Sequence, residues 1–229
     1  MIGTIYNTAM ILVGSAAGSF FRRGLKEKYR AVLFDAMGLA AAGVGINAIA
    51  KNMPDSEYPV LFIISLALGS LIGTKLDIDG AFNWLTGKSG NQNLGQGLST
   101  AILLFCIGTL SILGPIESAV SGNNTFLFTN GTLDLVTSMV LASTYGIGIA
   151  LSAAVLFLWQ GGIYLAALYL QSFMSDAMMT EISLVGGFLI LCSGLSILHL
   201  KAFKTMNLLP SLLVPVIFFA VKGFFPQIL

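Results

Sequence analysis

Two aspartates lie inside otherwise apolar stretches and are the residues best placed to carry chemistry. Asp35 follows Phe34 near the start of one apolar run, and Asp134 follows Leu133 near the start of another. A carboxylate at membrane depth costs at least about 2.5–3.5 kcal/mol to insert, so each needs a compensating partner. Each aspartate could bind a cation, a proton or a polar solute. Each could equally cap the first turn of a helix and interact with the helix dipole.

Uncharged polar residues recur in the same apolar stretches. The amides, which can both donate and accept hydrogen bonds, are Asn47, Gln160 and Asn207. The hydroxyls and glycines that gather where one apolar run gives way to the next are Ser138, Ser143, Thr144, Gly146 and Gly148. Hydroxyls beside a helix break expose backbone carbonyls at membrane depth, as in transporter ion sites. These residues and the two aspartates therefore form the predicted solute or ion site. The alternative is that amides tie helices together and hydroxyls bond to their own helix.

Cysteine and histidine do not indicate a catalytic or metal centre. Cys106 and Cys192 each lie inside an apolar run without paired spacing, and His199 is the single histidine. Metal sites and Cys/His catalytic pairs need several such residues at characteristic spacings. We therefore expect no enzymatic activity, no metal and no cofactor. The balance of 11 basic and 10 acidic residues provides no basic face, so nucleic acid is not an expected partner.

The composition indicates a lipid environment for these residues. Hydrophobic residues make up 56% of the 229 residues and charged residues 9%, and the mean hydropathy is +0.89. Soluble domains carry roughly 25% charged residues, so this chain cannot cover a water-facing surface. The apolar residues come in long runs without helical or strand periodicity. We predict one all-α membrane domain over residues 1–229, with the lipid bilayer as its partner.

Uncharged runs of about 17 to 25 residues predict a bundle of about eight transmembrane helices. The approximate runs are residues 5–21, 31–50, 59–74, 98–116, 133–145, 149–173, 182–200 and 208–225. The fifth run is short, so residues 133–148 either span fully or form a re-entrant segment. Gly146 and Gly148 form either a tight turn between two helices or a break within one.

Positively charged residues predict the orientation of the bundle. Cytoplasmic loops of membrane proteins retain Lys and Arg, and the loop after the first run carries Arg22, Arg23, Lys26, Lys28 and Arg30. This loop is therefore predicted to be cytoplasmic, with the N-terminus outside. Eight spans also place four further lysines inside and five acidic residues outside, the latter being Asp55, Glu57, Glu117, Asp176 and Glu181. A re-entrant fifth segment would reverse the last three spans and lose this agreement.

Two alignments suggest inverted repeats. The first matches residues 7–12 with 99–104, and Asp35 with Asp134, and relates spans one to three to spans four to six. The second relates spans one to three to spans six to eight, by matching Gly38, Gly45 and Asn47 with Gly187, Gly194 and Ser196. Either alignment gives the inverted arrangement common in transporters. The alternative is that small residues recur in every membrane helix. Two small-xxx-small pairs, Gly14 with Gly18 and Gly69 with Gly73, favour close helix packing, and we expect a homo-oligomer.

Several short motifs occur together in this chain. They are Phe105-Cys106-x-Gly108, Leu133-Asp134, Ala142-Ser143, Gly146-Ile147-Gly148, Gln160-Gly161, Gly186-Gly187, Gly194 and Asn207-Leu208-Leu209-Pro210. With these motifs the chain resembles the YqgA/YdfK-like family of bacterial inner-membrane proteins, a family of unassigned function, over nearly its whole length. The resemblance implies a multi-pass protein of the bacterial cytoplasmic membrane. It supplies no substrate and no catalytic residue.

The expected function is a membrane transporter that moves a small solute or monovalent ion through the polar site between repeats. One alternative is an ion channel, in which the same residues line a continuous pore. A second alternative is a scaffold or sensor that transports nothing.

Overall fold

The structure, a computed structural model, describes residues 1–20, 26–81, 98, 101–102, 104–106, 109–170 and 175–224. Within these residues the chain is helical and contains no strand, which confirms the all-α class. The main helices are α1 (Ile2–Phe20), α2 (Glu27–Asn52), α3 (Leu61–Leu76), α6 (Thr109–Val120), α7 (Thr125–Tyr145), α8 (Ser152–Leu170), α9 (Asp176–Ile197), α10 (Thr205–Leu208) and α11 (Leu213–Phe224). Short 3-10 turns are η1 (Met53–Asp55), η2 (Ile147–Leu151) and η4 (Leu209–Leu212).

Four helical stretches in the described part of the chain are long and apolar enough to cross a membrane: Thr125–Tyr145, Ile147–Leu170, Asp176–Ile197 and Thr205–Lys222. Helices α3 and α6 are apolar but shorter. Large apolar side chains cover the outside of the bundle, for example Leu158, which is 73% exposed, and Leu71, which is 68% exposed. Apolar surface of this extent needs lipid or another apolar partner to cover it.

Helix α7 is longer than the sequence predicted. It begins at Thr125 rather than near Leu133, and its 21 residues suffice for a full span. The polar residues of its first half are compatible with a helix because the hydroxyls of Thr129 and Thr132 donate to carbonyls one turn earlier. Gly146 then ends α7 with φ +86°, and η2 leads into α8. The Gly146 segment is therefore a turn between two helices.

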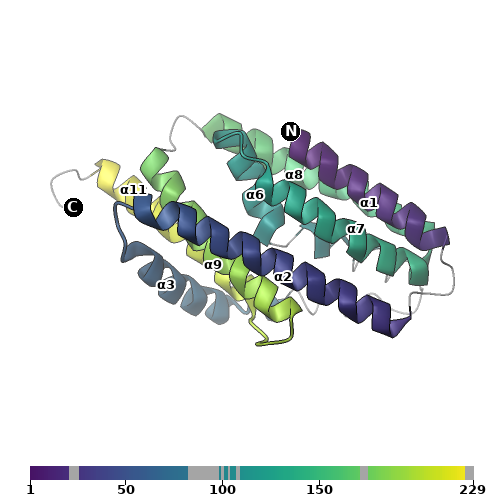
Figure 1. Ribbon diagram of the computed structural model, residues 1–229. Coiled ribbons are helices and arrows are strands. Elements are labelled where there is room, and N and C mark those ends of the chain that lie inside the picture. The colour runs from purple at the N-terminus through teal and green to yellow at the C-terminus, as the bar shows by residue number, and fades with distance from the viewer. Residues whose placement is uncertain are drawn as a thin grey trace.

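The helices pack in pairs (Figure 1), with α2 and α9 central, α3 on one side of them, and α1 and α8 on the other. Helix α1 runs parallel to α7: the Gly3 N–H donates to Asn124 Oδ1 at 3.2 Å at the start of both helices. Further along, Gly18 closely approaches the Met139 carbonyl. Helix α3 runs antiparallel to the last span, because its Gly69 meets Ser211 while Gly73 meets Asn207. Both small-xxx-small pairs therefore pack within this one chain.

Helices α2 and α9 run antiparallel, and each contributes glycines to their contact. A Cβ on Gly45 would lie 2.5 Å from the backbone nitrogen of Leu191. A Cβ on Gly194 would lie 2.5 Å from the backbone nitrogen of Ala42. The two contacts are equivalent. The starts of α2 and α9 are 149 positions apart, and the same difference separates Gly45 from Gly194 and Ala42 from Leu191. A local two-fold axis therefore passes between these helices.

The start of α1 and the end of α11 lie at the same end of the bundle, which we call the first end. At this end α2 finishes and α9 begins. Gly3 of α1 bonds to Asn124 in the loop before α7, and Lys222 of α11 bonds to the Tyr58 hydroxyl in the loop before α3. At the opposite, second end, α1 and α7 finish.

Candidate functional site

A cavity of about 390 Å³ lies among α2, α6, α7 and α9, with Asp134 in its wall. We call it the Asp134 cavity. Most of its lining is apolar, and its polar members are Thr109, Asn130, Asp134, Thr137 and Ser193. The position of Asp134, more than two turns into the 21-residue α7, is too far along the helix for an N-terminal cap. The carboxyl therefore needs partners from other residues.

The described hydrogen-bond partner of Asp134 is an amide. The Asn130 side-chain nitrogen donates to Asp134 Oδ2 at 2.9 Å, and the aspartate is only 6% exposed. Asn7 of α1 lies close to this carboxyl, but neither polar atom of Asn7 forms a hydrogen bond within the described residues. The buried Thr109 hydroxyl, also in the lining of the cavity, has no partner either. Buried polar atoms that lack partners are rare in proteins and indicate a place where a ligand, ion or water can bind.

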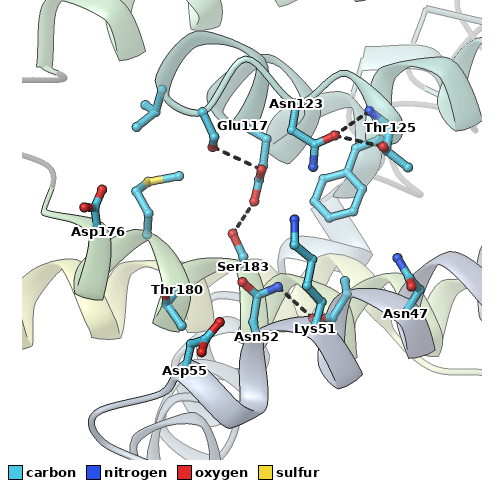
Figure 2. Close-up of a pocket in the computed structure, with 15 residues that line it drawn as sticks. Asn47, Lys51, Asn52, Asp55, Glu117, Asn123, Thr125, Asp176, Thr180 and Ser183 are labelled. Atoms are coloured by element: carbon cyan, nitrogen blue, oxygen red, sulfur yellow. Dashed lines mark hydrogen bonds between the residues drawn. The ribbon is translucent and has the colours of Figure 1, made fainter.

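A second cavity, of about 460 Å³, opens at the first end among the same four helices. We call it the vestibule, and Figure 2 shows the side chains that line it. Its charged members are Lys51, Asp55, Glu117 and Asp176. Glu117 is 8% exposed and accepts hydrogen bonds from Ser183 and, at 3.3 Å, from Ser121. The vestibule is thus polar and carries more acidic than basic groups.

A third cavity, of about 660 Å³, lies at the second end, where α1 and α7 finish. Its polar lining comes from Ser19, Ser143, Thr144 and the turn at Gly146. The Ser143 hydroxyl donates to the Val140 carbonyl at 2.7 Å, and Thr144 donates to the same carbonyl at 3.4 Å. These hydroxyls therefore bond within their own helix, which was one of the two alternatives for them.

Two apolar clusters separate the three cavities. In the first cluster, Ala48 and Phe126 face the vestibule, while Leu110 and the adjoining Leu133 face the Asp134 cavity. In the second, Phe105 and the adjoining Leu141 line the Asp134 cavity. Ala142 and the adjoining Tyr145 of this second cluster line the third cavity. An apolar layer therefore lies between the Asp134 cavity and the cavity at each end of the bundle.

The remaining predicted site residues lie apart from Asp134. Asp35 is exposed on α2, and Asn47, also exposed, lines the vestibule. Ser138 is buried against Gly14 of α1 and donates to its own helix. Gly148 is half-buried in η2. The structure therefore distributes the predicted residues over several places instead of gathering them into one site.

Two of the predicted amides tie elements together. Gln160 of α8 donates to the Ser111 hydroxyl of α6 at 3.0 Å, and its own oxygen has no partner. Asn207 accepts from the Asp79 N–H at 2.8 Å, and its nitrogen has no partner. Both side chains are almost fully buried. They connect helices as uncharged amides in membrane proteins commonly do.

Four polar residues of the Asp134 cavity were not predicted from the sequence: Thr109, Asn130, Thr137 and Ser193. Asn130 lies one turn before Asp134 on the same helix face, but the predicted span began after it. Thr109 and Ser193 come from other helices, and no spacing in the sequence relates them to Asp134. Glu117 and Glu181 were predicted in outer loops, whereas the structure places both as buried residues within α6 and α9.

The described residues contain no group of three or more His, Cys, Asp or Glu side chains able to hold a metal ion. Cys106 is a buried free thiol, and Cys192 is a half-buried one. The chemistry available in the described cavities is therefore that of carboxylates, amides and hydroxyls, together with the Lys51 ammonium of the vestibule.

A family model described as "Protein of unknown function (DUF554)" matches residues 2–220. The chain belongs to the DUF554 family. This DUF554 chain is 56% identical over 225 residues to the "Uncharacterized membrane protein YdfK" of Bacillus subtilis (strain 168), covering 98% of both chains. It is 28% identical to the "Uncharacterized protein YqgA" of Escherichia coli (strain K12), covering 93% of this chain and 94% of that one. These matches confirm the resemblance found in the motifs. No solved structure matches significantly.

Proposed function

We propose that this DUF554 protein is a membrane carrier that moves a small solute or ion through the Asp134 cavity. The observation that carries the proposal is the position of a buried carboxyl between two apolar layers, with a polar cavity beyond each layer. A carrier needs a central site that is closed to at least one side at any time. Ionisable residues inside a membrane domain most often mark such a pathway.

The local two-fold axis between α2 and α9 supports inverted repeats of spans one to three and six to eight. A Cβ on Gly38 would meet the Leu198 side chain and backbone nitrogen, the latter at 3.1 Å. A Cβ on Gly187 would meet the Ile49 side chain and backbone nitrogen, the latter at 3.0 Å. Two such repeats can exchange their conformations, and this motion opens one fixed site alternately to each side of the membrane. The other alignment, through residues 99–104, lies partly outside the described residues.

The same two layers favour a carrier over the two alternatives. An open channel requires a continuous path, and the packed layers interrupt it on both sides of Asp134. Asp134 lines a cavity, whereas the buried Glu181 holds a loop in place, and this difference favours a solute pathway over a scaffold or sensor. Multi-pass insertion into a bacterial cytoplasmic membrane is part of the proposal, and the four long apolar helices and the bacterial relatives support it.

The test is flux into proteoliposomes that contain the purified protein, with a panel of monovalent ions, amines and neutral metabolites. We expect saturable uptake of at least one solute and counterflow against its gradient, which a channel does not produce. Asp134→Asn should abolish this uptake, while the matched exposed variant Asp35→Asn should retain it. Uptake without counterflow would indicate a channel. Absence of uptake across the panel, or full activity of Asp134→Asn, would overturn the proposal.

A further inference from the structure

The Asp134 cavity contains one carboxyl and a largely hydrocarbon wall, and this combination restricts its ligand. We propose that the cavity binds a small organic monocation, such as a protonated amine with an apolar body. Its charge would meet the Asp134 carboxylate, and its body would fill the rest of the cavity. This inference deepens the proposed carrier function and rests on the same site.

The charge of the site favours a cationic ligand. Asp134 is buried, and its described hydrogen-bond partner is the amide of Asn130. No basic side chain in the described part of the chain forms an ion pair with it. A carboxylate withdrawn from water needs a compensating positive charge, because amide dipoles replace only part of its hydration. A bound cation supplies that charge.

The lining of the cavity favours an organic cation over a bare metal ion. Hard cations such as Ca²⁺ are held by about six or more oxygen ligands, and dehydrating an ion without them is costly. The lining offers one carboxyl, three hydroxyls and the Asn130 amide in a wall that is otherwise apolar. The hydroxyls of Thr137 and Ser193 donate to carbonyls of their own helices, at 3.0 and 3.1 Å, and keep lone pairs that can accept. An ammonium group needs fewer acceptors than a metal ion, and Asp134 and Thr109 can supply two.

The wall of the Asp134 cavity also fits the apolar body of an organic cation. The remaining wall includes Phe105, Leu110 and Leu133 from three segments of the bundle. A volume of about 390 Å³ lies in the range of small-molecule sites, which are mostly apolar with a few placed polar groups. The aromatic ring of Phe105 can also attract a cation held near its face. Hydrocarbon contact thus adds binding free energy that an inorganic ion cannot obtain.

The vestibule supports the same ligand charge. It contains the carboxylates of Asp55, Glu117 and Asp176 against the single ammonium of Lys51. These side chains surround one polar opening at the first end (Figure 2). A cleft lined mainly by one sign of charge concentrates counter-ions of the opposite sign. Organic cations would therefore be enriched beside the apolar layer that leads to Asp134.

The experiment measures equilibrium binding of benzylamine, which is protonated near neutral pH, to purified full-length protein in detergent. Benzyl alcohol serves as a neutral analogue of similar shape, and sodium and potassium chloride serve as inorganic competitors. We expect saturable binding of benzylamine and at least about tenfold weaker binding of benzyl alcohol, from loss of one charge-assisted contact. Asp134→Asn should weaken benzylamine binding by at least about tenfold for the same reason, and Asp35→Asn should not change it.

Thr109→Val provides an independent variant of nearly equal volume. It should weaken benzylamine binding by about threefold to tenfold, because it removes one neutral hydrogen-bond acceptor. Thr109→Val should leave the size-exclusion elution profile of the protein unchanged, which shows that the variant is folded. Equal affinity for benzylamine and benzyl alcohol, or displacement by sodium at comparable concentrations, would overturn the inference. Unchanged binding in both Asp134→Asn and Thr109→Val would do so as well.

The binding experiment and the flux experiment test the two proposals separately. Benzylamine binding without uptake of any solute would support this inference and contradict the carrier function. Uptake of an inorganic ion or neutral solute without benzylamine binding would support the carrier function and contradict this inference.

Discussion

At the scale of single residues, three buried carboxyls lie in different surroundings. Asp134 faces a cavity and accepts from the Asn130 amide, whereas Glu117 accepts from serines at the edge of the vestibule. Glu181 is fully buried and accepts from the Ser56 hydroxyl at 2.6 Å and the Tyr58 N–H at 3.1 Å. Glu181 therefore holds the loop between α2 and α3 through Oε1, while its Oε2 has no partner within the described residues.

Glu181→Ala should therefore destabilise the fold without altering the Asp134 cavity. Removing the acceptor leaves two donors unsatisfied, and an unsatisfied buried polar group costs about 1–3 kcal/mol. The measurement is the midpoint of thermal unfolding in detergent, with exposed Glu57→Ala in the same loop as the matched control. We expect a lower midpoint for Glu181→Ala alone. Equal midpoints for the two variants would show that these hydrogen bonds contribute little.

At the scale of helices, small residues decide how closely the central elements approach. Gly45 of α2 and Gly194 of α9 each leave no room for a Cβ against the facing backbone. Gly43, on the same helix as Gly45, has nothing within 4 Å of its Cβ position. The glycines at the α2–α9 contact are therefore required by packing, and Gly43 is not.

Gly45→Ala and Gly194→Ala should destabilise the protein to a similar extent, because their contacts are equivalent across the local two-fold axis. Overpacking of this kind typically costs about 1–3 kcal/mol. Gly43→Ala should be neutral or slightly stabilising, since alanine favours helix by roughly 1 kcal/mol over glycine. Thermal unfolding of the three variants in detergent checks this. A destabilising Gly43→Ala, or very different effects at Gly45 and Gly194, would contradict the packing argument.

At the scale of the whole molecule, the start of α1 and the end of α11 lie at the same end of the bundle. An even number of spans places both termini at one end of the bundle. The distribution of basic residues predicts that this first end faces outward. The homo-oligomer remains a prediction, and its supposed glycine contacts are already occupied by α7 and the last span.

Fusions of alkaline phosphatase and green fluorescent protein to each terminus in a bacterial host test this topology. Both termini should give phosphatase activity and little fluorescence, since phosphatase folds outside the cytoplasmic membrane and the fluorescent protein inside it. Opposite results at the two termini would indicate an odd number of spans. Fluorescence at both would reverse the orientation.

The sequence by itself determined the all-helical membrane class, because 9% charged residues cannot cover a water-facing surface. It also identified Asp134 as a residue that needs partners, since the cost of a carboxyl in lipid does not depend on the fold. Only the tertiary structure decided which polar residues meet. Asp35 and Asp134 look alike in sequence, yet one is exposed and the other lines a cavity with Thr109 and Ser193. The rotation and packing of each helix decide which of its faces points inward, and the polar residues of α2 and α7 are spread too evenly around each helix for the hydrophobic pattern to specify that rotation.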